Sequence, residues 1–121
     1  MMTARVISLA SLTMLLLASC AATLQDPVVA VVKGSKENDG KFISLAGVLR
    51  EKNGFFNLFS KDGEECVGVL LTDQQRNDYR ASAGKRVTLT GTLEAEGCGR
   101  DGICVEHLCG PTILTNITAL R

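Results

Sequence analysis

The chain has 121 residues, and its 13 basic and 13 acidic side chains balance to a formal charge of zero. This length allows one small domain, which can bury somewhat more than about 60% of its unfolded surface. A balanced chain lacks the basic stripe with which proteins displace counterions from phosphates, so binding to nucleic acids driven by charge is not expected.

Residues 1–20 have the pattern of a targeting segment. Arg5 is the only charged residue, and an apolar run from Val6 to Ala18 follows it. A helix that crosses a membrane needs about 20 apolar residues, and this run is shorter. The pattern is therefore typical of a signal peptide that is removed from the mature protein.

The apolar run ends in Leu17-Ala18-Ser19-Cys20, which resembles the lipobox of bacterial lipoproteins. The resemblance implies that residues 1–19 are removed and that Cys20 receives fatty acyl chains, such as palmitate, on its sulfur and its new amino terminus. Several chains anchor a protein stably, whereas one chain binds only marginally. Ala21 follows the cysteine, which by the same resemblance favours the outer membrane with the domain facing the periplasm. The alternative is an ordinary secretory signal cut after Ala22, and both interpretations export the protein.

Residues 20–40 are predicted to be a lipidated tether, and residues 41–121 to be the folded domain. The short apolar run 28–32 is either an extra edge strand or the end of the tether packed on the domain. The polar segment 34–40, which contains two glycines, is expected to be a flexible connection.

Three strands are predicted next. Apolar residues alternate along residues 42–50, where Gly47 interrupts the apolar row at a bend or bulge. Asn53-Gly54 is a strong hairpin signal, and Asp62-Gly63 marks the following turn. The second and third strands are therefore expected at residues 55–60 and 66–71.

A short helix and two further strands complete the predicted domain. Thr72 and Gln75 match a capping box, and the helix is expected to run over residues 73–83 to a left-handed cap at Gly84. Residues 87–93 alternate apolar side chains with threonines, and residues 112–120 form the last strand. Tyr79 is expected on the buried side of the helix.

The predicted order is β-β-β-α-β-β, with glycines inside the first and fourth strands and the segment GKRVTLTG after the helix. This order resembles the OB-fold, a five-stranded Greek-key barrel. It is similar in particular to the small exported bacterial OB-fold domains, including those grouped by fold similarity as nucleic-acid-binding, tRNA-anti-like domains. The expected fold class is therefore mainly β: an OB-fold-like barrel with one short helix, after a signal helix and a tether. An SH3-like barrel is the structural alternative.

Assigning Cys20 to the lipid anchor leaves four cysteines, which in an oxidising compartment are read as two disulfides. The OB-fold resemblance implies that the third and fifth strands run parallel, so Cys66 is expected to pair with Cys109 and Cys98 with Cys104. The other pairing considered joins Cys98 to Cys109 and Cys66 to Cys104. Neither the spacing of a structural zinc site nor a C-x-x-C redox pair occurs, so no metal and no cofactor are expected.

The OB-fold resemblance also implies a binding face on the second and third strands, beside the loops that join strands one to two and four to five. Strand pleating sends Phe55 and Phe56 to opposite faces, and we assign Phe55 to the binding face. The candidate binding residues are Phe55, Phe59, Arg50, Lys52, Arg100, Asp101 and His107.

The expected function is that of a non-enzymatic binding module, anchored in the membrane, whose partner is another envelope protein or an oligosaccharide. No catalytic residues are assigned, because no nucleophile and base are paired in the sequence. Binding of single-stranded nucleic acid, a common use of OB-folds, is the alternative; the neutral charge and the envelope address argue against it.

Overall fold

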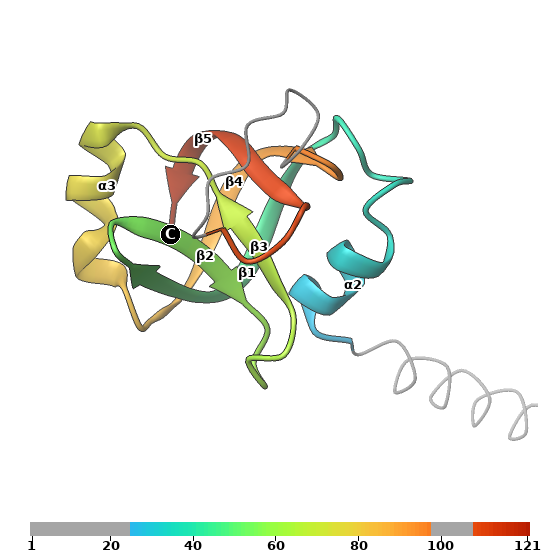
Figure 1. Ribbon diagram of the computed structural model, residues 1–121, viewed down its shortest axis with the longest axis horizontal. Helices are drawn as coiled ribbons and strands as arrows, with labels where there is room; N and C mark the ends of the chain where they lie inside the picture. The colour runs from blue at the N-terminus through green and yellow to red at the C-terminus, as the bar shows by residue number, and fades with distance from the viewer. Residues whose placement is uncertain (1–24, 98–107) are drawn as a thin grey trace, which may run out of the picture.

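The computed structural model describes residues 25–97 and 108–121 (Figure 1). Its helices are α2 (Pro27–Lys33), α3 (Asp73–Tyr79) and the 3-10 helix η1 (Arg80–Ser82). Its strands are β1 (Phe42–Lys52), β2 (Phe55–Phe59), β3 (Cys66–Val69), β4 (Arg86–Glu94) and β5 (Ile113–Leu120). Within these two ranges, no helix is both long enough and apolar enough to span a bilayer.

The five strands close into a barrel in the order β1-β2-β3-β5-β4. β3 and β5 pair in parallel over only two positions, Gly68 with Ile113 and Val69 with Leu114. The other neighbouring strands pair in an antiparallel sense, including β1 with β4, which completes the barrel. The prediction of a mainly β chain built around a five-stranded barrel is confirmed.

The core consists of the inward side chains of all five strands together with Val28 of α2. Its members are apolar and almost fully buried: Val28, Leu45, Leu49, Phe56, Leu58, Val67, Val69, Val87, Leu89, Leu93, Leu114 and Ile117. Phe56 lies in this core with 1% of its surface exposed, whereas Phe55 is half-buried. Strand pleating therefore separates the two adjacent phenylalanines as expected.

The hairpin between β1 and β2 turns at Asn53 and Gly54, which both have positive φ angles of 54° and 82°. Two successive residues with positive φ are the mark of the tight turn that the Asn-Gly pair predicted. β3 ends at Val69, two residues earlier than expected, and the amide of Leu70 still donates to the carbonyl of Leu114 at 3.0 Å.

α3 begins with the predicted capping box. The Thr72 hydroxyl accepts from the Gln75 amide at 3.1 Å, and the Gln75 side chain accepts from the Thr72 amide at 3.0 Å. The α-helix is shorter than expected, because it ends at Tyr79 and continues only as η1. The chain then turns at Gly84, φ 86°, so that the Gly84 amide donates to the Leu49 carbonyl and β4 can begin beside β1.

Residues 28–32 lie in a helix rather than in an edge strand. Pro27 occupies the first turn of α2, and the Asp26 carboxylate accepts from the amide of Val28 at 2.9 Å, which caps the helix. Val28 is fully buried and packs where Gly47 leaves space on β1. α2 and α3 lie at opposite ends of the barrel (Figure 1).

The connection from α2 to β1, which we expected to be flexible, is hydrogen-bonded to the end of β4. The Gly40 amide donates to the Leu93 carbonyl at 2.7 Å, and the Leu93 amide donates to the Lys41 carbonyl at 2.9 Å. The Ala95 amide donates to the Asp39 carboxylate at 2.9 Å. These bonds extend the β1–β4 pairing and hold α2 on the barrel.

Candidate functional site

The outer face of β1 and β2 carries the candidate binding residues that lie on these strands. In the register of the pair, Arg50 lies opposite Asn57 and Lys52 lies opposite Phe55. Residues at alternate positions of a strand share a face, so Arg50, Lys52, Phe55 and Phe59 all point away from the buried Leu49 and Leu58. The structure thus brings the predicted strand residues to one side of the barrel.

Arg50 lies over the ring of Phe59, with the guanidinium carbon 4.8 Å from the ring centroid. This distance is within the range of a cation–π contact, which holds the flexible side chain in place. The neighbouring Glu51 forms its ion pair with Arg80, at 3.3 Å, and not with Arg50. The acidic residue of β1 therefore does not neutralise Arg50.

The segment that leads into β5 crosses the outer face of β2 and β3. Leu108 packs so closely on Gly68 that a methyl group there would lie 3.1 Å from its Cδ2 atom. The Cys109 amide donates to the Asn57 side-chain oxygen at 3.0 Å, and Asn57 is only 6% exposed. The centre of the predicted binding face is therefore covered by the protein itself.

Leu108 and Cys109 divide the predicted binding face into two separate hollows. The larger, here called the cation groove, has a volume of about 510 Å³ and is lined by Arg50, Glu51, Lys52, Asn57, Phe59, Leu108 and Cys109. Phe55 lies instead in a smaller hollow of about 130 Å³, together with Leu70, Leu71 and Arg76. The structure does not bring Phe55 and Phe59 into one site.

A disulfide joins Cys66, at the start of β3, to Cys109, before β5. This confirms the expected Cys66–Cys109 bond and excludes the alternative in which Cys66 joins Cys104. Neither sulfur is then a free thiolate for a metal ion. Cys98 and Cys104, as well as Arg100, Asp101 and His107, lie outside the described residues.

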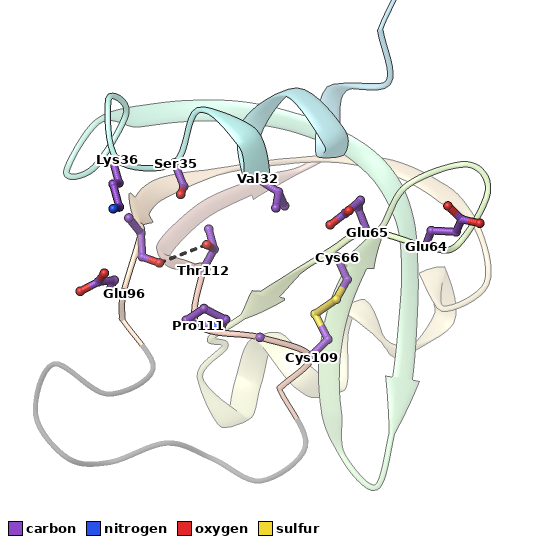
Figure 2. A pocket seen from close by; sticks show the side chains of 12 residues that line it. Val32, Ser35, Lys36, Glu64, Glu65, Cys66, Glu96, Cys109, Pro111 and Thr112 are labelled. Atoms are coloured by element: carbon purple, nitrogen blue, oxygen red, sulfur yellow. Dashed lines mark hydrogen bonds between the residues drawn. A yellow bond between two sulfur atoms is a disulfide. The ribbon is translucent and has the colours of Figure 1, made fainter.

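The disulfide also borders a further hollow, distinct from the two described above, which the sequence pattern did not indicate (Figure 2). It has a volume of about 400 Å³ and lies between the end of α2, the start of β3 and the approach to β5. Glu64 and Glu65 lie on one side of it, and Glu96 lies on the other beside Lys36 (Figure 2). Its wall is fixed by the Thr112 hydroxyl, which donates to the Ala95 carbonyl at 3.1 Å.

No protein-family model, curated protein or solved structure matches the chain. Within residues 25–97 and 108–121, no group of three or more His, Cys, Asp or Glu side chains is arranged to hold a metal ion.

The Asp62 carboxyl group has a lowered pKa. Hydrogen bonds from the Ser60 hydroxyl and from the Glu64 amide lower the pKa of Asp62 below its usual 3.8. Both bonds favour the charged carboxylate. Asp62 stabilises the turn between β2 and β3 and does not line the cation groove.

Proposed function

We propose that the chain is a bacterial envelope lipoprotein, anchored through Cys20, whose barrel is a non-catalytic binding module of the OB-fold type. The lipobox-like sequence before Cys20 supports the anchor. The Cys66–Cys109 disulfide supports the exported location, because structural disulfides persist in oxidising compartments and are rare in the cytosol. The module binds an acidic partner, a protein or an oligosaccharide, in the cation groove.

The observation that carries this proposal is the pair of cations in the groove. Arg50 and Lys52 form no ion pair within the part of the chain that the structure describes. The Arg50 guanidinium lies over the Phe59 ring, 4.8 Å from its centroid, and this contact restricts the side chain. A guanidinium that is already positioned loses less side-chain entropy when it binds a carboxylate.

The same contact selects the kind of partner. Arg50 covers the ring of Phe59, so this ring is not open for stacking by a nucleic-acid base or a sugar. Single-stranded nucleic acids bind OB-folds through such stacking. Recognition in the cation groove therefore relies on carboxylates, which acidic peptides and acidic glycans both carry.

The proposal is tested with a photo-crosslinking amino acid at position 59 in cells that express the full chain. We expect a discrete crosslinked species, and we expect Arg50→Glu together with Lys52→Glu to abolish it, because reversed charges repel a carboxylate. Lys41→Glu is the matched control, since Lys41 precedes the other end of β1.

Two digestions of the crosslinked species identify the partner. Loss of the added mass on proteolysis of the partner indicates a protein, and loss on digestion with glycan hydrolases indicates an oligosaccharide. A crosslinked species that survives the double charge reversal unchanged would overturn the assignment to the cation groove.

The anchor has its own test, which is the mass of the mature amino-terminal peptide. We expect a peptide that begins at Cys20 and carries acyl chains. A mature chain that begins at Thr23 without lipid would show an ordinary secretory signal and would remove the anchor from the proposal.

A further inference from the structure

The docking of α2 leaves few residues between Cys20 and the barrel, and this inference rests on the lipid anchor proposed above. If all of residues 20–40 were flexible, the barrel would sample every orientation at the membrane. Val28 is instead fully buried in the core, and the Asp26 carboxylate binds both the Val28 amide and the Lys61 amide, each at 2.9 Å. Only residues 21–25 then separate Cys20 from the fixed position of Asp26.

Chain length limits how far the barrel can lie from its anchor. Whatever path residues 21–25 take, they span at most about 20 Å between Cys20 and Asp26. This reach is shorter than the diameter of a small domain, which is about 30 Å. The barrel therefore cannot turn its α3 end to the membrane, because α2 and α3 lie at opposite ends (Figure 1).

The surface around Asp26 is a hollow formed by four parts of the chain that are distant in sequence. Its volume is about 990 Å³, and its lining residues are Gln25, Asp26, Pro27, Val48, Lys61, Asp62 and Arg86. Val48 and Arg86 are paired across β1 and β4, so they share the outer face. Gln25 and Asp26, the first described residues after the proposed anchor in sequence, form part of this hollow.

The charged side chains that line this hollow differ in whether other groups of the protein bind them. Asp26 accepts two backbone amides, and Asp62 accepts the Ser60 hydroxyl and the Glu64 amide. Lys61 and Arg86 are exposed, and neither forms an ion pair within the described ranges. The carboxylates are thus occupied by donors of the protein, whereas the two cations are available to an external anion.

We propose that the α2 end of the barrel lies against the bilayer surface and that Lys61 and Arg86 contact lipid phosphate groups there. Each basic residue near an anionic membrane surface increases the binding constant for that surface about fivefold. The barrel is then held in one orientation, with α2 at the membrane and the β1–β2 hairpin directed away from it.

The test compares two lysines of the complete lipidated protein. The protein is reconstituted in vesicles of phosphatidylethanolamine and phosphatidylglycerol, and amine acylation is followed by mass spectrometry. We expect Lys61 to react about fivefold more slowly in vesicles than in detergent micelles, because lipid headgroups cover it. Lys52, in the hairpin at the far end of the barrel, serves as the internal control and should react equally in both.

Matched arginine variants separate charge from geometry. Arg86→Gln should reduce the protection of Lys61 in the anionic vesicles, whereas Arg76→Gln, on α3 at the far end, should not. Vesicles of phosphatidylcholine should protect Lys61 less than the anionic vesicles do.

Two outcomes would overturn the inference, and they differ in what else they overturn. If the protein floats with the vesicles while Lys61 and Lys52 react equally, the anchor stands and the fixed orientation is wrong. If the protein does not float with the vesicles, the anchor is wrong as well.

Discussion

Gly47 shows how a single missing side chain allows α2 to dock. A Cβ atom at this position would lie 2.8 Å from Leu58 Cγ and 2.9 Å from both the Phe59 carbonyl oxygen and Val28 Cγ2. Contacts below 3.0 Å force neighbouring groups to move. We therefore expect Gly47→Ala to lower the free energy of unfolding by about 1–3 kcal/mol, measured by urea denaturation.

The control for this substitution is Gly110→Ala, which introduces the same methyl group where no atom lies within 4 Å. It should change the free energy of unfolding by less than about 0.5 kcal/mol. The double variant Gly47→Ala, Val28→Ala should lose less free energy of unfolding than the two single variants lose together, because the smaller residue 28 makes room for the new methyl group. Equal effects of the two glycine substitutions would contradict the packing described for α2.

At the scale of elements, α3 depends on its capping box. Thr72→Ala removes the acceptor of the Gln75 amide and should lower the free energy of unfolding by about 1 kcal/mol in thermal denaturation. Gln75→Ala should lower it further, because the Gln75 side chain also donates to the Ile117 carbonyl at 2.7 Å and so joins α3 to β5. Gln74→Ala, on the exposed side of the helix, is the control. A Thr72→Ala protein as stable as this control would show that the cap contributes nothing.

Local sequence signals predicted the elements that depend on local chemistry. The strands follow from alternation and from the Asn53-Gly54 turn, and α3 follows from Thr72 and Gln75. α2 was not predicted, although Asp26 and Pro27 form a local helix-start signal, because its run of valines favours a strand by propensity. Burial of Val28 against Gly47 outweighs that propensity, and the sequence alone does not show this contact.

The candidate site, like the fold, was predicted only in part. The OB-fold resemblance grouped Arg50, Lys52 and Phe59 beside one face, and the register of β1 with β2 brings these three residues to the same side of the barrel. The covering of Asn57 by residues 108–109 was not predicted, because it depends on the path of a loop over a sheet far away in sequence. The Cys66–Cys109 pairing was the one available signal for that path.

At the scale of the whole molecule, the Cys66–Cys109 disulfide closes a loop with a sequence separation of 43 residues. Loop-closure entropy gives such a crosslink about 4 kcal/mol, which is a large part of a typical total of about 5–15 kcal/mol. We expect Cys66→Ser together with Cys109→Ser to lower the melting temperature by about 15–30 °C, measured by calorimetry.

Alkylation gives an independent check of the same bond. The folded, unreduced protein should show no modification of Cys66 or Cys109 by iodoacetamide, and both should be modified after reduction. Modification without a reductant would show that these thiols are free. An unchanged melting temperature in the double serine variant would show that the crosslink does not limit stability.

The position of this disulfide also determines how the barrel responds to a pulling force. β3 and β5 are the only neighbouring strands in the described barrel that pair in parallel, and they share just two paired positions. Under tension this junction has the fewest backbone hydrogen bonds to resist separation. The disulfide bridges one end of it, so the barrel can open there only as far as the covalent bond allows.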